Sequence, residues 1–282
     1  MNLEKLLPDD GPSISEVNKY IEKYKNDFIV IKVGGSCLLD QNLFDQLVED
    51  ISIINRLGLK AIVVHGGGKN IKIKLDEANI EIKFINGLRV TDENTIKIVE
   101  DCLIALNNEI ISKLKSKNCE GIQFSPNKNN IIIVDPINKE LMYVGNPKKI
   151  KTDLIIQELE SNKVPVIVPM GKGKDNKNYN INADHAALEI AKKINARRLL
   201  LMTDVEGVLD KEKKLIPEIN SETANKMIND GTISGGMIPK INTCLDAVNN
   251  GVIGVAMVDG RKSHSILFEI FSDKGAGTLI RK

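Results

Sequence analysis

The sequence has few aromatic residues and no excess of either charge. Aromatic side chains make up 4% of the 282 residues, tryptophan is absent, and 39 lysines and arginines face 38 aspartates and glutamates. A balanced charge provides no strong basic surface for nucleic acid or for an anionic membrane. We therefore expect neither nucleic acid nor a membrane as a partner. By elimination, this balance favours a protein that acts on small molecules.

Disulfide, zinc and membrane patterns are also missing. The cysteines Cys37, Cys102, Cys119 and Cys244 form no C-x-x-C pair, so the sequence predicts neither a disulfide framework nor a structural zinc site. No segment approaches the ~18 apolar residues that a membrane span needs, and residues 1–11 lack the apolar core of a signal peptide. These absences predict a cytoplasmic protein, or a stromal one if the gene is plastid-encoded.

What the sequence does contain is an alternation of short β-branched runs and amphipathic segments, which is typical of βα units that build a mainly parallel sheet. The expected strands are residues 28–33, 61–64, 131–134, 164–168, 199–203 and 253–258. One expected helix carries an apolar stripe from Ile96 to Leu114, and another carries Leu43 to Ile54 and ends at Gly58, which suits a left-handed position. Residues 172–179 are expected to form a surface hairpin.

A leading helix is expected before the first strand. Ser13 and Glu16 have the spacing of a capping box, and an apolar stripe follows at Ile14, Val17, Ile21 and Tyr24. This stripe packs either on its own subunit, which the pattern alone favours, or on another subunit. The expected division is residues 1–26 as an N-terminal extension, 27–197 as one lobe and 198–282 as a second lobe.

Two glycine loops follow predicted parallel strands. Lys32 stands near the end of the first strand before Gly34 and Gly35, and His65 ends the second strand before three glycines, residues 66–68. Backbone amides freed by glycine bind anions, and ligands bind at the carboxyl ends of parallel strands. The alternative for each loop is an ordinary glycine turn. Neither loop matches the P-loop or the dinucleotide-binding pattern, so two separate anion sites are predicted.

Two later positions fit a phosphoryl-transfer site. Asp184 lies where a helix begins, and Lys240 follows a flexible glycine pair. A second cation would neutralise charge on a transferring phosphoryl group. Taken alone, Asp184 could simply complement a helix dipole, and Lys240 could be a solvated helix residue.

From Ser13 onward the chain resembles the N-acetylglutamate kinases, which have the amino acid kinase fold. The segments that carry the resemblance are Ile31-Lys32-Val33-Gly34-Gly35, His65-Gly66-Gly67-Gly68, Asn86-Gly87-Leu88-Arg89-Val90-Thr91, residues 179–184, Thr203-Asp204-Val205-Glu206-Gly207-Val208 and Gly236-Met237-Ile238-Pro239-Lys240. The resemblance implies a three-layer αβα sandwich with two lobes. It also implies transfer of the γ-phosphoryl group of ATP to the side-chain carboxylate of N-acetyl-L-glutamate, in arginine biosynthesis.

The resemblance also implies residue roles. Lys32 and Lys240 would stabilise the transferring group, and Asp184 would hold both amines. The acceptor would contact Gly67, Gly68, Arg89 and Asn180. The nucleotide would contact Gly34, Gly35, Thr203, Asp204, Gly207 and Val208. Magnesium would arrive with ATP on its phosphate oxygens, without a protein-built metal site or a tightly bound cofactor.

The leading helix and the segment 264–278 resemble the arginine-inhibited branch of the family. This implies an L-arginine site at Tyr20, His264, Glu269 and Gly275, a hexamer built as a trimer of dimers, and a possible PII-type signalling partner. Residues 264–271 could instead be a plain amphipathic helix. Ser125-Pro126-Asn127-Lys128 departs from the family pattern, so the role of that loop is open.

Two alternative functions stay open at this point. One is a sister kinase of the same fold that acts on acetylaminoadipate-type substrates, carbamate or aspartate, although segment 86–91 favours acetylglutamate. The other is a non-catalytic arginine sensor, against which the retention of Lys32, Asp184 and Lys240 argues.

Overall fold

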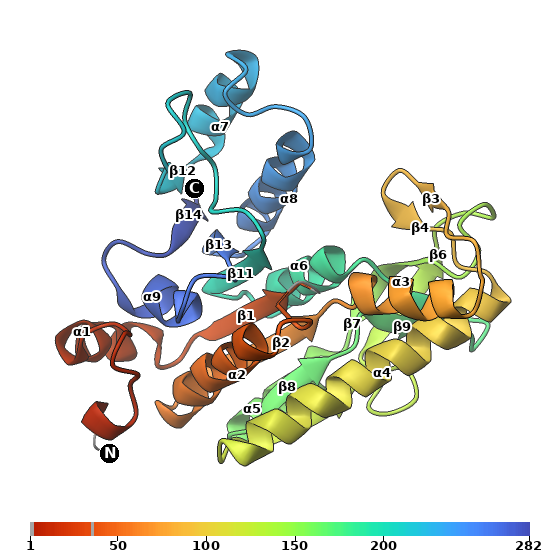
Figure 1. The fold of residues 1–282 in the computed structure, drawn as a ribbon, viewed down its shortest axis with the longest axis horizontal. Coiled ribbons are helices and arrows are strands. Elements are labelled where there is room, and N and C mark those ends of the chain that lie inside the picture. The colour runs from red at the N-terminus through yellow and green to blue at the C-terminus, as the bar shows by residue number, and fades with distance from the viewer. Residues whose placement is uncertain (1–2, 35–36) are drawn as a thin grey trace.

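A computed structural model describes residues 3–34 and 37–282. An eight-stranded sheet runs through the molecule in the order β12-β14-β13-β11-β1-β2-β8-β5 (Figure 1). Its strands are β1 (Phe28–Val33), β2 (Lys60–His65), β5 (Gly121–Phe124), β8 (Val164–Ile167), β11 (Arg198–Thr203), β12 (Glu218–Ile219), β13 (Gly254–Asp259) and β14 (Gly277–Ile280). β14 pairs antiparallel with β13, and the other pairs are parallel. The prediction of a mainly parallel sheet is confirmed.

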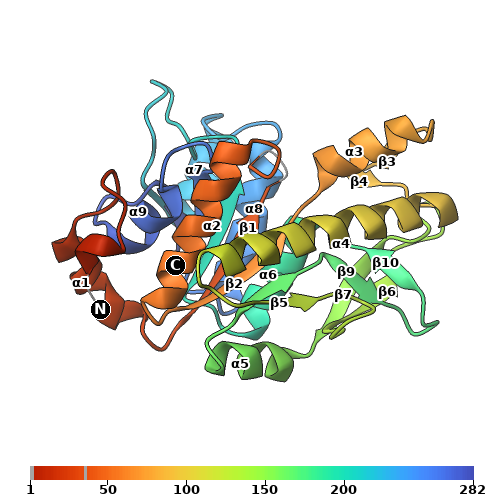
Figure 2. The ribbon, with the colours of Figure 1, turned by 60° about the horizontal axis from the view of Figure 1, so that its bottom comes forward.

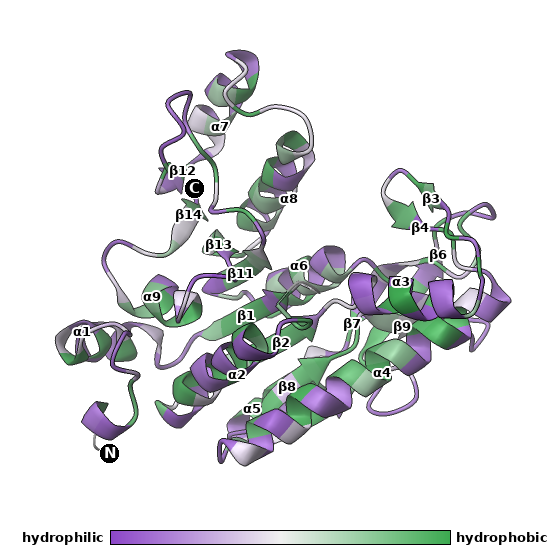
Figure 3. Cartoon of the chain, viewed as in Figure 1, coloured by the Kyte–Doolittle hydropathy of each residue, from purple (hydrophilic) through white to green (hydrophobic). Residues whose placement is uncertain are grey.

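Helices cover both faces of this sheet (Figure 2). One face carries α2 (Gln41–Arg56), α4 (Glu93–Ser116) and α9 (Ser265–Phe271); the other carries α5 (Thr152–Glu160), α6 (Ala183–Lys193) and α8 (Met237–Asn249). α7 (Ser221–Asn229) packs on α8. In Figure 3 the central strands are coloured hydrophobic and the helices turn hydrophilic residues outward. The expected three-layer sandwich is therefore present.

A second sheet corrects one expectation. Residues 131–134 were predicted to join the main sheet, but β6 (Ile132–Pro136) instead lies in a four-stranded sheet of order β10-β9-β6-β7. Its partners are β7 (Gly145–Ile150), β9 (Met170–Lys172) and β10 (Asn178–Asn180), and β9 and β10 form the expected hairpin. α3 (Gly68–Glu77) and a two-stranded hairpin, β3 (Phe84–Ile85) and β4 (Leu88–Arg89), lie at the same end of the molecule.

Helix ends follow the local sequence signals. Gly58 has φ +81°, and Gly58 and Leu59 donate to the carbonyls of Asn55 and Ile54, which is a Schellman motif closing α2. Ser13 and Glu16 form the expected capping box of α1 (Ile14–Tyr24). After a short 3₁₀ turn, η1 (Leu3–Lys5), the chain enters α1, which packs on α9. Val17 and Tyr24 are buried within the same chain, as the pattern alone favoured.

The alternation of side chains along β1 determines the face of the sheet on which Lys32 lies. Ile29 and Ile31 pack with α2, α4 and α9, whereas Val30 packs with the apolar cluster of α5, α6 and α8. Because successive side chains of a strand point to opposite faces, Lys32 shares the face of Val30. β1 is also the strand at which the chain order reverses, with β2 on one side and β11 on the other. The carboxyl end of such a strand is the usual ligand crevice of an open α/β sheet.

Candidate active site

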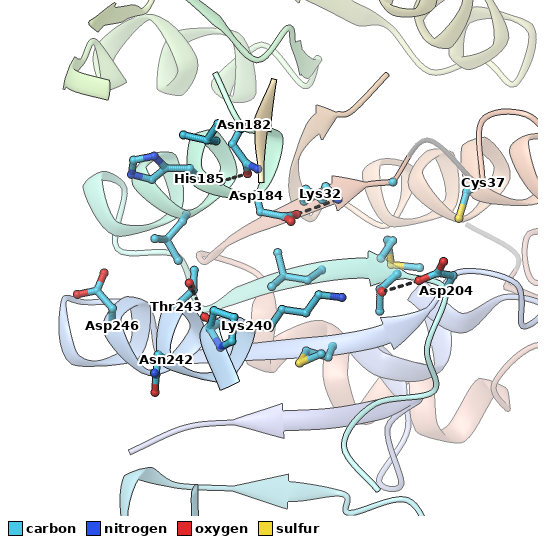
Figure 4. Close-up of a pocket in the computed structure, with 18 of the residues that line it drawn as sticks. Lys32, Cys37, Asn182, Asp184, His185, Asp204, Lys240, Asn242, Thr243 and Asp246 are labelled. Atoms are coloured by element: carbon cyan, nitrogen blue, oxygen red, sulfur yellow. Dashed lines mark hydrogen bonds and ion pairs between the residues drawn. The ribbon is translucent and has the colours of Figure 1, made fainter. Parts of the chain in front are cut away.

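A cavity of about 870 Å³ opens at the carboxyl ends of β1, β11 and β13, within the size range of small-molecule sites (Figure 4). Lys32, Asp184 and Lys240 line it from β1, α6 and α8. The sequence motifs that were predicted to act together therefore meet in one space.

Lys32 and Asp184 form an ion pair of 2.8 Å between Nζ and Oδ1. The lysine side chain is 14% exposed and the aspartate 47%, so the pair lies at the cavity wall with its carboxylate toward solvent. Asn182 caps α6 by accepting from the backbone N–H of His185, which places Asp184 in the first helical turn beside Lys32. Asp184 thus fixes the lysine amine at the end of β1.

Lys240 lies in the first turns of α8 and is exposed. In Figure 4 its side chain extends across the same opening as Lys32, from the opposite wall. Within residues 3–34 and 37–282 its amine has no ion-pair partner, in contrast to that of Lys32. A free amine at this place is available to an anionic ligand.

The structure describes only part of the glycine loop that follows β1. Gly34 lines the cavity, and a Cβ there would approach the carbonyl oxygen of Met202 to 3.1 Å, so the loop runs tightly against β11. The predicted contact at Gly35 lies outside the described residues. Cys37, which follows, is buried against Gly260 in the loop after β13.

A second cavity of about 230 Å³ adjoins the first. The four residues predicted to bind the acceptor, Gly67, Gly68, Arg89 and Asn180, line it together with Gly66. Lys32, Leu88, Asn182 and Asp184 line both cavities. The two cavities therefore meet at the Lys32–Asp184 pair.

Gly67 and Gly68 both line this second cavity, but the reason for the absence of a side chain differs between them. A Cβ on Gly67 would lie 2.7 Å from Leu103 Cδ2 and 3.1 Å from Leu106 Cδ1, whereas a Cβ on Gly68 would have no atom within 4 Å. Close packing on α4 thus accounts for the missing side chain at Gly67, which is compatible with an ordinary glycine turn and with anion binding by its amide. Gly68 faces open cavity, which agrees with close approach of a ligand.

Arg89 projects from β4 into the second cavity. Its guanidinium lies over the Phe84 ring at 5.0 Å, and Nη2 donates to the carbonyl oxygen of Gly68 at 3.3 Å. Nη1 is buried and finds no acceptor in the described part of the chain. Burial lowers the pKa of Arg89 from its ordinary value, although the group stays charged. An unpartnered guanidinium donor of this kind is suited to an acceptor such as a carboxylate.

The predicted nucleotide residues divide into two groups. Thr203 and Asp204 line the larger cavity, where the Thr203 hydroxyl donates to Asp204 at 3.4 Å. Gly207 and Val208 are buried instead and lie outside the cavity lining. The Val208 amide donates to Thr278 Oγ1 at 2.8 Å, and that hydroxyl donates to the Ile216 carbonyl at 2.7 Å.

Asn182 and Thr278 were missed by the sequence reasoning. Asn182 lines both cavities; it lies in segment 179–184, and its individual signal was a cap position before a helix. Thr278 is fully buried and anchors the loop with Gly207 and Val208; it ends segment 264–278, and its individual signal was a hydroxyl within an apolar strand.

The residues predicted to bind arginine lie in α9, at its ends and on the adjacent helix α1. Glu269 is 7% exposed, accepts from the Ala276 amide at 2.9 Å and lies against Gly275, where a Cβ would approach Oε2 to 2.9 Å. Burial raises the pKa of Glu269. Tyr20 donates to Asp273 at 2.5 Å, a hydrogen bond that raises the pKa of Tyr20 to about 12.

His264 is engaged elsewhere. Its Nδ1 lies 2.6 Å from Oδ1 of buried Asp50, and its Nε2 lies 3.3 Å from Asp10. The ring is 6% exposed and ties α9 to α2 and to the N-terminal segment. The structure therefore brings Glu269 and Gly275 together and gives His264 a structural connection.

Three further expectations concern features away from the cavities. The loop with Ser125 and Lys128 is a tight turn with two backbone hydrogen bonds, tied to Glu100 of α4 through Asn127, and it lines neither cavity. No group of three or more His, Cys, Asp or Glu side chains suited to a metal occurs in residues 3–34 and 37–282. None of the described helices combines the length and apolarity that a bilayer crossing demands.

Comparisons with a family model and with known proteins agree on one family for this chain. The model of the amino acid kinase family matches residues 27–259. An acetylglutamate kinase from Pelagibacter ubique is 54% identical over 98% of this chain and 96% of its own length. An acetylglutamate kinase from Clostridioides difficile is 43% identical over 100% of this chain and 99% of its own.

Solved structures share the fold at lower identity. N-acetylglutamate synthase from Neisseria gonorrhoeae, complexed with coenzyme A and N-acetyl-glutamate, superposes with a TM-score of 0.87 at 21% identity, over 96% of this chain. This chain spans 64% of the length of that synthase chain. Carbamate kinase from Giardia lamblia bound to AMP-PNP has a TM-score of 0.64 at 17% identity, over 91% of this chain and 98% of its own.

Proposed function

The chain belongs to the amino acid kinase family, and from that premise we propose that it phosphorylates the side-chain carboxylate of N-acetyl-L-glutamate with ATP. The products are N-acetyl-L-glutamyl 5-phosphate and ADP, a step of arginine biosynthesis. The observation that carries the proposal is the junction of two anion cavities at Lys32 and Asp184. A donor phosphate in one cavity and an acceptor carboxylate in the other would meet there.

The chemistry needs alignment and charge stabilisation more than a base. A carboxylate oxygen of the acceptor attacks the γ-phosphorus, and the bond to the β–γ bridging oxygen breaks as its electrons leave with ADP. The acceptor is already anionic, so no proton has to be removed. Lys32 and Lys240 neutralise charge that spreads over the equatorial oxygens, and magnesium enters with ATP as part of the substrate.

Acceptor recognition is assigned to the smaller cavity. The unpartnered Nη1 of Arg89 supplies a donor for a carboxylate that does not react, and Asn180 lines the same cavity. Gly68 lets the ligand approach the first turn of α3, where amides have no helical partner. Thr203 and Asp204 border the nucleotide on the opposite side.

A hydroxylamine-trapping assay tests the activity and its substrate. We expect acyl phosphate from N-acetylglutamate and ATP, and little from aspartate, carbamate or acetylaminoadipate. Preference for one of those acids would overturn the acceptor assignment in favour of a sister kinase. Arginine binding by calorimetry without any phosphoryl transfer would instead favour a sensor.

We also propose feedback inhibition by L-arginine at α9 and the loop after it. The support is a buried carboxylate, Glu269, beside a glycine with φ +67° and close to the cationic Arg198 and the N-terminal helix α1. A guanidinium is a natural partner for such a carboxylate. Glu269→Gln should lose most of the inhibition while the matched surface variant Glu222→Gln keeps it. Equal inhibition of both variants would place the effector elsewhere.

A homo-oligomer, with the hexamer as its specific form, is proposed through the part of the α1 apolar stripe that its own chain leaves exposed. Ile14 is 37% exposed and Ile21 is partly exposed, whereas Val17 and Tyr24 are already buried in their own chain. Sedimentation of the full chain and of an Ile14→Asp variant tests it. A monomer in the unmodified protein, or an unchanged assembly in the variant, would contradict this role of α1.

A further inference from the structure

His65 is a buried histidine that the proposed reaction does not use. It ends β2, is 0% exposed and directly precedes the glycine loop of the acceptor cavity. Along β2, Ala61 and Val63 pack toward α2 and α4, so His65 faces α4 by the same alternation. Burial lowers the pKa of His65 to about 4, and the ring is therefore neutral at physiological pH.

A hydrogen-bond chain determines which ring nitrogen carries the proton. Nδ2 of Asn107, a fully buried residue of α4, lies 3.0 Å from the carbonyl oxygen of Val166 and 3.1 Å from Nε2 of His65. The Val166 carbonyl can only accept, which requires the amide nitrogen of Asn107 at that position. The second hydrogen of the same amide then points at Nε2, which must accept it. The proton of the neutral ring consequently lies on Nδ1.

That proton is directed at the glycine loop. Nδ1 of His65 lies 3.4 Å from the carbonyl oxygen of Gly66, so the ring donates to it. The Gly66 amide donates to the Val33 carbonyl at 2.8 Å. Both polar backbone groups of Gly66 are thus used inside the protein, which leaves the amides of the next two glycines for a ligand.

The geometry of the peptide bond transmits this orientation. In a planar trans peptide the carbonyl and the following N–H point in opposite directions. A Gly66 carbonyl held toward the buried ring of His65 therefore turns the Gly67 N–H away from the interior, toward the cavity that residues 66–68 line.

We propose that His65 is a positioning residue: Asn107 holds its ring in the Nδ1–H tautomer, and this tautomer orients the Gly66–Gly67 peptide so that the Gly67 amide binds the acceptor carboxylate. The inference rests on the proposed function, because the acceptor is the ligand of this loop. The state of the ring can be measured without any turnover, and this separates the two ideas.

Nitrogen-15 NMR of the unliganded wild-type chain, with labelled histidine, tests the first half. The chain has three histidines, so the His65 signals are assigned by their loss in a His65→Asn variant. We expect a protonated Nδ1, an unprotonated Nε2 and no titration of this ring between about pH 5 and 9. A protonated Nε2, or a ring that titrates near its ordinary pKa, would overturn the proposal.

Two matched substitutions test the second half. Asparagine can place its amide nitrogen near the position of Nδ1, so His65→Asn keeps the donor to Gly66. Glutamine reaches only the Nε2 side, so His65→Gln keeps the Asn107 contact and loses that donor. We expect His65→Gln to raise the KM for N-acetylglutamate by about three- to tenfold, the weight of one hydrogen bond, with the KM for ATP unchanged.

The outcomes are distinguishable. His65→Asn should stay close to the wild type in KM, and kcat should change little in either variant. Equal KM values for the two variants would refute the positioning role, since a purely structural role predicts similar damage from both. If the wild-type chain failed to phosphorylate N-acetylglutamate, the proposed function would fall while the tautomer measurement still stood.

Discussion

Gly67 and Gly68 are neighbours in sequence that should respond in opposite ways to the same added methyl group. Gly68 is the first residue of α3, and a Cβ added there would have no atom within 4 Å. A Cβ added to Gly67 would lie 2.7 Å from a Leu103 methyl group. Gly68→Ala should therefore fold at least as well as the wild type, with a gain of up to about 1 kcal/mol because alanine loses less backbone entropy in a helix. Gly67→Ala should lose about 1–3 kcal/mol through overpacking.

Gly68→Ala, the more stable of the two variants, should nevertheless bind the acceptor more weakly than the wild type. The methyl of Gly68→Ala occupies space in the acceptor cavity, and a misplaced methyl in a binding pocket weakens recognition by about 10–200-fold. We expect that increase in the KM for N-acetylglutamate, with the KM for ATP near the wild-type value. Urea unfolding gives the stabilities, and coupled ADP release gives the kinetics. An unchanged acceptor KM in Gly68→Ala would refute the assignment of this glycine to ligand approach.

Three further outcomes follow from the same site and from α9. Lys240→Ala should lower kcat by about 10²–10³-fold, the usual cost of one transition-state donor, while calorimetry still detects N-acetylglutamate binding. Arg89→Lys should raise the acceptor KM by about 10–100-fold, because lysine cannot reproduce a planar fork, and steady-state kinetics with ATP varied separately provides the control. The hydrogen bond to Asp50 raises the pKa of His264 above 6.5, so the folded state holds its proton more tightly. Burial raises the pKa of its partner Asp50 to about 6, so the ion pair is complete only between that pH and the raised pKa of His264. Its contribution is lost as pH rises through the folded-state pKa of His264, and it weakens as pH falls below about 6. Unfolding free energies of the wild type and His264→Asn should thus differ most within this window and approach each other above it; a difference that keeps growing with pH would contradict the assignment.

Much of the architecture could be predicted because local signals and burial agree. The stripe from Ile96 to Leu114 has the helical period and became α4, and Gly58 ended α2 in the left-handed conformation that the sequence indicated. Lys32 was identified because a lysine near the end of an apolar strand needs a polar exit, and the structure provides Asp184.

The errors have physical causes too. Residues 131–134 have the apolar character of a central strand, but strand propensity does not specify which sheet a strand joins, and β6 pairs with β7 and β9. Strands as short as β12, with two residues, have no detectable period. The packing requirement at Gly67 could not be foreseen, because the side chain that crowds it, Leu103, is distant in sequence.

The apolar core is continuous across the proposed boundary between the two lobes. The apolar cluster on the α6 and α8 side joins Val30 and Ile190 to Leu199 and Met257, across the proposed boundary near residue 197. The cluster on the opposite face joins Ile31 and Ile51 to Leu200, Ala256 and Phe271. β1 and β11, one from each side of the boundary, are adjacent and parallel in a single sheet.

This continuity makes the chain one cooperative unit. Neither half can melt without exposing the apolar surface of the other, so heat or denaturant should unfold both in a single transition. Acceptor or nucleotide, bound on one side of the boundary, should then raise the midpoint for the whole chain. Residues from both halves of the sequence recognise the substrates, but the stability of the chain against denaturation depends on the single sheet that joins the two halves.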